Sequence, residues 1–189
     1  MKSKIRIILG ITGASGVIYG VRMLEVLAAN PAVETHLILT DGAKLTLSLE
    51  TSKTLGQLNQ LADVVHDDHN LAAPISSGSF PVHGMMVLPC SIKSLSMIAH
   101  CQGSSLLARA ADVTLKENRK LILSPRETPL HLGHLRLMTQ AVEQGALLCP
   151  TMPGFYHQPT SIESLIDHSI GKILDLMGIS NNLFQRWEG

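Results

Sequence analysis

The sequence has no excess of charge of either sign. Its fifteen lysines and arginines balance fifteen aspartates and glutamates, and only 16% of its 189 residues are charged. Without a global basic field to gather nucleic acid or an anionic membrane surface, any anion-binding site must be local. The balance therefore disfavours a nucleic-acid role.

Long apolar runs, a secretory cleavage site and a cysteine framework are also missing. Although 45% of the residues are hydrophobic, no run approaches the roughly 18 residues that a membrane-spanning helix needs. The first apolar run, after "MKSK", continues into a glycine turn, so we expect a strand there and no signal peptide. Cys90, Cys101 and Cys149 are odd in number and lack C-x-x-C spacing, which argues against disulfides and against a zinc site. These absences predict a cytoplasmic protein without membrane insertion, whose surplus apolar surface forms subunit contacts.

Short β-branched or aliphatic runs alternate with longer segments of helical period. The predicted strand and helix pairs are residues 5–11 with 17–29, 35–40 with 43–50, 85–88 with 91–100, 121–124 with 132–143, and 146–149 with 162–177. This alternation predicts a single α/β domain over residues 1–189, in three layers, with a mostly parallel sheet and helices on both faces. A polar C-terminal tail is expected at about residues 181–189.

The first predicted strand runs into "GITGASG", where Gly10, Gly13 and Gly16 recur every three residues. Free backbone N–H groups at the helix start would attract an anion, and Ser15 could add its hydroxyl. The alternative is a tight turn in which Ser15 is only the helix N-cap. Because a dinucleotide turn needs G-x-G-x-x-G, the spacing favours a phosphate or a flavin.

Polar residues gather after the strands, where parallel sheets bind their ligands. Thr40 ends the second predicted strand and suits a small ligand, while the neighbouring Asp41 keeps a nicotinamide ribose as an alternative. The turn "PCSIKS" supplies Ser91, Lys93 and Ser94, and its alternative interpretation is a capped helix start. Two anion-competent turns at one edge are less expected by chance than one.

Three charged residues are candidates for the chemistry. Arg126 and Glu127 lie between two prolines directly after the predicted strand at 121–124, where Arg126 could clamp a phosphate and Glu127 could move protons. A local ion pair is the alternative. Glu50 ends a predicted helix among apolar neighbours, which predicts a buried carboxylate with a raised pKa. A partly exposed carboxylate at a helix end is the competing interpretation.

Further cations lie along the second half of the chain. Arg109 and Lys116 are seven residues apart and therefore share a helix face, with Asp112 between them. They form either a surface ion-pair ladder or an anion-binding face at a packed interface. Tyr156 in "GFYHQP" offers a phenolic hydroxyl, and Lys172 follows on the last predicted helix.

Metal-dependent and hydrolytic chemistry have no support in the motifs. His66 and His69 lie in an acidic loop, and His131 and His134 lack a partner carboxylate at a metal-binding spacing, so no metal site is expected. The sequence has no G-x-S-x-G motif and no motif-level arrangement of serine, histidine and aspartate.

The motifs "GITGASGVIYGVRML", "SLET", "ISSGSF", "LPCSIKSLS", "RAADVTLKE", "PRETPLHLGHLRLM" and "PGFYHQP" occur in this order. In this combination, over nearly the whole chain, the sequence resembles the UbiX-type flavin prenyltransferases. The resemblance implies a Rossmann-like (flavodoxin-like) fold and metal-independent transfer of a dimethylallyl group from dimethylallyl phosphate to N5 and C6 of reduced FMN. The product, prenylated FMN, would serve a UbiD-type decarboxylase, typically in ubiquinone biosynthesis. The resemblance also implies a homo-oligomer, a dodecamer, with sites where subunits meet.

The resemblance assigns roles to the residues that match the family's motifs. FMN would be held by Gly13, Ala14, Ser15, Thr40, Ser91, Ile92, Lys93, Ser94 and Arg126. The prenyl phosphate would be bound by Arg109, Lys116, Tyr156 and Lys172, with Trp187 near the site. Catalytic roles are implied for Ser15, Glu50 and Glu127. Lys172 stands where arginine is common, so it keeps the charge but loses the bidentate fork.

Two other functions stay open. A flavin-dependent decarboxylase of a cysteine-type substrate would need a histidine base after the second or third element and a substrate-clamping loop, neither of which the sequence shows. A non-enzymatic FMN carrier, or partner of a decarboxylase, would need the flavin turns but not the set formed by Arg109, Lys116, Tyr156 and Lys172. That set therefore discriminates a transferase from a carrier.

Overall fold

Strands in the order β3-β2-β1-β4-β5-β6 form one parallel sheet in the computed structural model, which describes residues 4–187. The strands are β1 (Ile5–Ile11), β2 (Val33–Leu39), β3 (Val64–Asp67), β4 (Gly84–Cys90), β5 (Lys120–Pro125) and β6 (Leu147–Leu148). The helices are α1 (Val17–Ala28), α2 (Asp41–Glu50), α3 (Leu55–Leu61), α4 (Ile92–Ala99), α5 (Leu106–Lys116), α6 (Leu132–Glu143) and α7 (Ile162–Met177), with a 3-10 turn at Pro74–Ser76. The strand order reverses between β1 and β4, which makes this junction the topological switch point.

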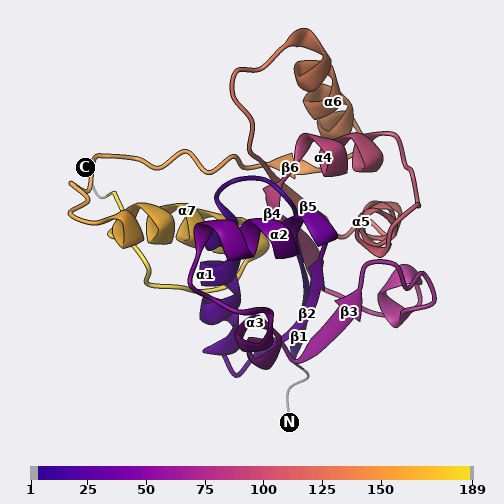
Figure 1. Cartoon of the computed structure of the whole chain (residues 1–189), viewed down its shortest axis with the longest axis horizontal. Coiled ribbons are helices and arrows are strands. Elements are labelled where there is room, and N and C mark those ends of the chain that lie inside the picture. The colour runs from indigo at the N-terminus through magenta and orange to yellow at the C-terminus, as the bar shows by residue number, and fades with distance from the viewer. Residues whose placement is uncertain (1–3, 188–189) are drawn as a thin grey trace.

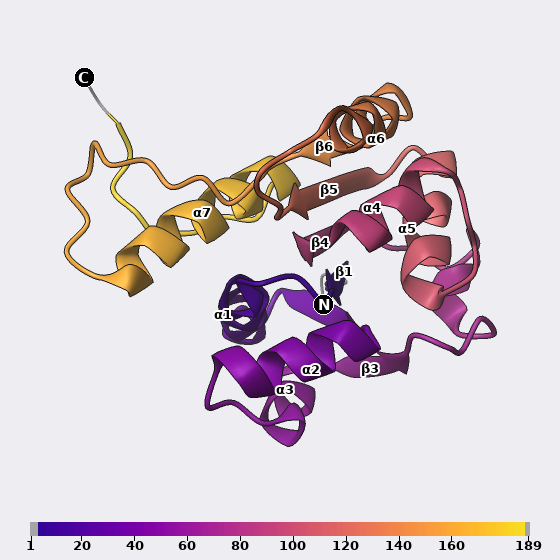
Figure 2. The same ribbon diagram turned by 45° about the horizontal axis from the view of Figure 1, so that its top comes forward.

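The sheet is buried on both faces, as helices cover each of them. On one face, α1 and α7 pack on β1, β2 and β4. On the other face, α4 and α5 pack on the same strands. Figures 1 and 2 show these helices on either side of the sheet. Every residue of β4 is buried. Double coverage explains why the strands read as continuous apolar runs, and the predicted three-layer α/β fold is confirmed.

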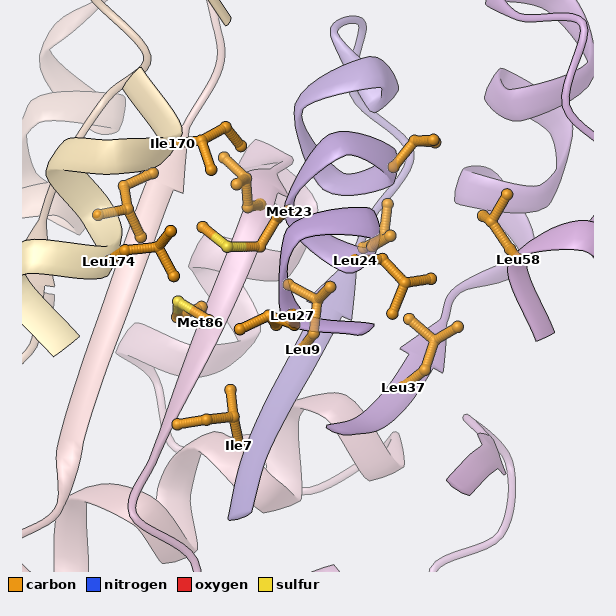
Figure 3. Packing of buried hydrophobic residues seen from close by; sticks show 14 of the residues in the cluster. Ile7, Leu9, Met23, Leu24, Leu27, Leu37, Leu58, Met86, Ile170 and Leu174 are labelled. Atoms are coloured by element: carbon orange, nitrogen blue, oxygen red, sulfur yellow. The ribbon is translucent and has the colours of Figure 1, made fainter. Parts of the chain in front are cut away.

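The core on the α1 face is built from alternate strand residues. Ile7 and Leu9 of β1 point toward Leu24 and Leu27 of α1, and α7 closes the same core with Leu174 (Figure 3). The intervening residue Ile8 belongs to the opposite core, beneath α4 and α5. This alternation is the period-2 geometry of a strand, and it fixes which side chains face which layer.

The sequence interpretation located most elements and missed two. The helix at 132–143 has the predicted bounds, but β2 begins at Val33 and α2 at Asp41, each two residues earlier than expected. The pattern did not locate α3 or the edge strand β3, which is four residues long and only half-buried. Short edge strands carry little hydrophobic signal.

Two parts of the chain extend away from the sheet. Helix α6 stands at one end of the molecule, and Ala141 is its buried residue, while Leu132 and Leu135 are exposed (Figure 1). Residues 149–161, here called the arm, run out from β6 before α7 returns along the sheet (Figure 1). Among residues 4–187, no helix combines the length and apolarity needed to cross a membrane.

Candidate functional site

Thr12 joins the turns that follow β1 and β4. Its side chain is fully buried, and its hydroxyl donates to the carbonyl oxygen of Pro89 at 2.8 Å. The hydroxyl oxygen of Thr12 in turn accepts a hydrogen bond from the backbone N–H of Ser91 at 2.7 Å. The two turns that the sequence analysis singled out as anion-competent are therefore tied together at the switch point. Sequence reasoning passed over Thr12, although a hydroxyl at the end of a buried strand was a signal.

Gly13 is needed for a close approach between the first turn and α2. A Cβ atom on Gly13 would lie 2.7 Å from the Cα of Gly42, and one on Gly42 would lie 3.1 Å from the Cα of Gly13. Contacts this short leave no room for a side chain at Gly13. The glycine therefore has a packing role in addition to any contact with a ligand.

A cavity of about 360 Å³ opens at the carboxyl edge of the sheet. Its lining comprises Gly13, Thr40, Asp41, Gly42, Asp68, His69, Ser91, Lys93, Ser94, Met97, Ser104 and Ser105. Of the residues predicted to hold a flavin, the structure brings Gly13, Thr40, Ser91, Lys93 and Ser94 to this wall. Ala14, Ser15, Ile92 and Arg126 lie outside the lining. The position matches the rule that ligands bind at the switch point of an open α/β sheet.

The cavity has lining residues that sequence reasoning missed. Asp68 and His69 follow β3, the strand that the pattern did not locate, and Ser105 caps α5 through a 3.3 Å bond from the N–H of Ala108. Asp41, the alternative ribose ligand, is bonded to Lys44 at 2.8 Å and to His69 at 3.0 Å.

Thr40 and Ser91 both cap helices, which the alternative interpretation held for Ser91 and did not predict for Thr40. The Thr40 hydroxyl accepts from the N–H of Ala43 at 3.2 Å, and the Ser91 hydroxyl accepts from the N–H of Ser94 at 3.2 Å. Both caps also line the cavity. The hydroxyls are thereby held at fixed positions at the edge of the sheet.

The turn before α1 differs from the predicted anion cradle in two respects. Gly16, with a φ of 88°, is the N-cap and Ser15 is not. Three N–H groups of this turn also have partners within the chain, beginning with that of Ala14, which donates to the carbonyl of Thr12 at 2.9 Å. The N–H groups of Gly16 and Val17 donate to the carboxylate of Glu50, the last residue of α2.

For Glu50, the expectation of a buried carboxylate with a raised pKa is wrong. Glu50 is exposed, and its Oε2 accepts from the N–H of Gly16 at 2.8 Å and from that of Val17 at 3.3 Å. Partial burial by itself would raise the pKa of Glu50. Hydrogen bonds from the Ser15 hydroxyl and the two N–H groups, together with the charge of Arg126, outweigh that effect and lower it. The competing interpretation, a helix-end carboxylate, is correct.

Arg126 and Glu127 are both exposed and do not form the ion pair that was considered for them. The backbone N–H of Arg126 bonds the carbonyl of Cys90 at 3.1 Å, which holds the loop beside the turn after β4. The carboxylate of Glu127 accepts from the N–H of Thr128 at 3.0 Å. The guanidinium of Arg126 faces the first turn closely enough to influence Glu50.

Arg109 and Lys116 lie on α5, on the face of the sheet opposite α7. Arg109 forms an ion pair of 2.6 Å with Asp112 and donates to the carbonyl of Ser76 at 3.2 Å. Lys116 pairs with the neighbouring Glu117. Of the ion-pair ladder considered as one alternative, the structure shows the pair of Arg109 with Asp112, and Lys116 pairs with Glu117 instead of Asp112.

Tyr156 and Trp187 come together on the other side of the molecule. Their rings meet edge to face, with centroids 5.6 Å apart. The hydroxyl of Tyr156 lies 3.1 Å from Nε2 of His168 on α7, and Lys172 follows one helical turn later. Within one chain, this group is separated from Arg109 and Lys116 by the sheet. Within residues 4–187, no three His, Cys, Asp or Glu side chains are grouped as metal ligands.

Comparisons with known proteins show the family to which the chain belongs. The family model described as Flavoprotein matches residues 1–186. The flavin prenyltransferase UbiX of Escherichia coli (strain K12) is 55% identical over 186 residues, which cover 97% of this chain and 98% of that protein.

Two solved structures have the same fold. The crystal structure of AnUbiX (PadA1) in complex with FMN and dimethylallyl pyrophosphate has a TM-score of 0.96 and 44% identity, covering 98% of each chain. A dodecameric FMN-dependent UbiX-like decarboxylase from Escherichia coli O157:H7 has a TM-score of 0.96 and 42% identity, covering 98% of this chain and all of that one. The chain therefore belongs to the flavoprotein family, among its UbiX flavin prenyltransferases.

Proposed function

We propose that this chain transfers the dimethylallyl group of dimethylallyl phosphate to N5 and C6 of reduced FMN. The observation that carries the proposal is the cavity at the switch point, whose wall contains residues from the turns after β1, β2 and β4. It occurs in a fold that superimposes with a TM-score of 0.96 on a relative solved with FMN and dimethylallyl pyrophosphate.

The cavity suits FMN in size and in chemistry. Its volume of about 360 Å³ lies in the usual range for small-molecule sites. Hydroxyl groups of Thr40, Ser91 and Ser94 and the ammonium group of Lys93 provide polar contacts along its wall. Gly13, Ala14, Ser15, Ile92 and Arg126 complete the set that would hold the flavin. Reduced FMN supplies the two nucleophilic ring positions to which the five-carbon unit is joined.

The prenyl phosphate requires cations, because it leaves as an anion and its charge must be stabilised away from water. Lys172, Arg109 and Lys116 supply positive charge, and Tyr156 supplies a hydroxyl donor. Since α5 and α7 cover opposite faces of one sheet, we infer that α5 of a second copy completes the phosphate site of the first.

Assembly into a homo-oligomer follows from that inference, and a dodecamer is the proposed form. A relative from Escherichia coli O157:H7 is described as dodecameric. Exposed apolar side chains suited to subunit contacts lie on α6 and on the arm, where Leu132, Met152 and Phe155 are all more than half exposed.

Proton transfer is assigned to carboxylates beside the first turn. Glu50 is ionised at neutral pH, and its lowered pKa makes it a weak proton acceptor. Ser15 bonds this carboxylate and lies at the turn, and Glu127 provides a second carboxylate next to Arg126. All three assignments are proposals from the family's motifs and from this arrangement.

The product would serve a UbiD-type decarboxylase in the cytoplasm, with ubiquinone biosynthesis as the usual context. The free thiols of Cys90, Cys101 and Cys149 agree with a reducing compartment.

The decisive experiment is anaerobic incubation with reduced FMN and dimethylallyl phosphate, followed by mass measurement of the extracted flavin. A flavin heavier by one five-carbon unit supports the transferase. Bound flavin of unchanged mass contradicts it and favours an FMN carrier. A parallel incubation with dimethylallyl pyrophosphate decides which donor is used.

A further inference from the structure

His168, which the sequence analysis passed over, lies between the arm and α7. Its two ring nitrogens have different partners. The backbone N–H of Gly154 donates to Nδ1 at 3.3 Å, and Nε2 lies 3.1 Å from the hydroxyl oxygen of Tyr156. One ring thus connects the backbone of the arm to the side chain of Tyr156.

The first of these contacts fixes the tautomer. A backbone N–H can only donate, so Nδ1 must accept with its lone pair, and the ring proton of the neutral imidazole is then on Nε2. Nε2–H therefore donates to the Tyr156 oxygen. Because the tyrosine oxygen accepts in this contact, its own hydrogen remains available to donate to another group.

Aromatic packing holds both rings in these orientations. The ring of His157 stacks on His168, with centroids 4.8 Å apart and an interplanar angle of 3°. Phe184 meets His168 edge to face at 5.0 Å, and Trp187 meets Tyr156 edge to face at 5.6 Å. The hydroxyl of Tyr156 therefore has little freedom of direction.

Burial and the neighbouring charges favour the neutral form of His168. Burial, followed by the charges of His157 and Lys172, lowers the pKa of His168 below 6.5. Around His168 and its partner Tyr156, the titratable and charged groups are His157 on the arm, Lys172 on α7 and Arg186 on the C-terminal tail. A protonated ring would lose the bond from Gly154, because both of its nitrogens would be donors.

We propose that His168 is a positioning residue that, as the Nε2–H tautomer, orients the Tyr156 hydroxyl to donate its hydrogen to an anionic phosphate beside Lys172. The identity of that phosphate, the leaving group of the prenyl donor, rests on the proposed function. The positioning itself rests on the contacts of Gly154, His168 and Tyr156.

The test is a double-mutant cycle. His168→Phe keeps an aromatic ring but removes both hydrogen bonds, and Tyr156→Phe removes only the hydroxyl. Each is expected to lower kcat/KM for prenyl transfer roughly tenfold, with FMN affinity unchanged. The double variant is expected to be no slower than Tyr156→Phe, because His168 acts only through that hydroxyl. Losses that multiply, or no loss in His168→Phe, overturn the proposal.

Two further variants guard against a merely structural effect. His168→Gln, whose amide can donate in place of Nε2–H, is expected to recover part of the rate lost in His168→Phe. His157→Phe keeps the stacked ring and breaks no hydrogen bond within the described residues, since both nitrogens of His157 are buried without a partner. It should leave transfer unchanged, and a loss equal to that of His168→Phe would show that packing alone matters.

Binding of inorganic phosphate, measured by calorimetry, separates this inference from the proposed function. If His168 positions the hydroxyl, His168→Phe and Tyr156→Phe weaken phosphate binding to the same extent, and the double variant weakens it no further. A wild type that binds phosphate in this pattern without prenylating FMN would overturn only the proposed function. Prenyl transfer without this pattern would overturn only the role of His168.

Discussion

Glu50 closes the N-terminus of α1 by accepting a 2.8 Å hydrogen bond from the backbone N–H of Gly16. A second bond of 3.3 Å from Val17 places the carboxylate at the positive end of the helix dipole. This is the position in which an anionic ligand is usually bound. Since the protein fills it with its own side chain, the flavin is expected to contact the other side of the turn, where Gly13 lines the cavity.

Replacing this carboxylate by an amide should destabilise the protein at neutral pH. Glu50→Gln removes the charge from the helix end, and we expect a loss of about 1 kcal/mol in the free energy of unfolding. The pKa of Glu50 is lowered in the folded state, so its contribution is present above the ordinary value of 4.5 and is lost as the pH falls through the folded value. Urea unfolding of both proteins at neutral pH and well below pH 4.5 measures the difference.

The matched control is Glu143→Gln, which changes an exposed carboxylate at the end of α6. It should alter the unfolding free energy by much less than Glu50→Gln. An equal effect of the two variants, or a Glu50→Gln effect that persists in acid, would contradict the capping role.

A second prediction compares two buried threonines, Thr12 directly after β1 and Thr35 within β2. Thr12→Val keeps the shape but removes the hydroxyl that bonds Pro89 and Ser91, leaving the carbonyl of Pro89 and the partly buried N–H of Ser91 without that partner. We expect a loss of about 1–3 kcal/mol and weaker FMN binding. The hydroxyl of Thr35 is buried without a hydrogen-bond partner among residues 4–187, so Thr35→Val should be neutral or stabilising.

Thermal unfolding and flavin titration of the two variants check this contrast. If Thr35→Val weakens FMN binding as much as Thr12→Val does, the link between the turns after β1 and β4 is not what organises the cavity.

Most of the fold could be predicted because each buried parallel strand is a continuous apolar run followed by a segment of helical period. The edge strand β3 could not, since it is short and half-exposed. The site was predictable as a set of strand-end turns, including Thr40 and Ser91, because topology alone brings those ends to one edge.

The contacts within the site were harder to predict. The roles of Thr12 and His168 depend on side-chain directions across 77 residues in one case and 14 in the other, and neither separation leaves a local pattern. The environment of Glu50 was misjudged because its apolar neighbours in sequence do not surround its carboxylate. Its partners come from the turn before α1, on another element.

A third prediction concerns the two faces of the sheet. Lys116→Ala should bind FMN normally but lose prenyl transfer, since Lys116 lies on α5, outside the cavity lining. Lys172→Ala should behave in the same way. If α5 of one copy serves α7 of another, co-expressed Lys116→Ala and Lys172→Ala chains should recover about a quarter of the wild-type transfer rate by random assembly.

The control for this complementation is a mixture of Lys116→Ala and Arg109→Ala chains. Both changes affect α5, so every α5 in such an assembly carries a defect and no activity should return. Recovery in the control, or none in the first mixture, would mean that the two cations do not meet across a subunit contact.

The fourth prediction concerns the C-terminal tail. The two terminal nitrogens of the Arg186 guanidinium donate to the carboxylate of Asp175, each at 2.8 Å, and the side-chain amide of Asn181 donates to the same carboxylate at 3.0 Å. This attachment holds Trp187 against Tyr156. Because Trp187 is the only tryptophan in the sequence, its fluorescence anisotropy reports on the tail directly. Asp175→Asn should lower the anisotropy and slow prenyl transfer, with FMN binding unchanged.

A matched variant on the same helix separates tail attachment from stability. Asp167 also bonds one arginine through both carboxylate oxygens, at 2.7 and 3.1 Å, but its partner is Arg22 of α1. Asp167→Asn and Asp175→Asn should each cost roughly 0.2–1 kcal/mol, because both ion pairs are partly exposed. Only Asp175→Asn should change the anisotropy of Trp187.

In wild type the anisotropy of Trp187 should also fall in acid, as the pH drops through the pKa of Asp175. Hydrogen bonds from Arg186 lower that pKa below 3.8. An equal response of both variants would show that the tail is held by its ring contacts and not by the ion pair.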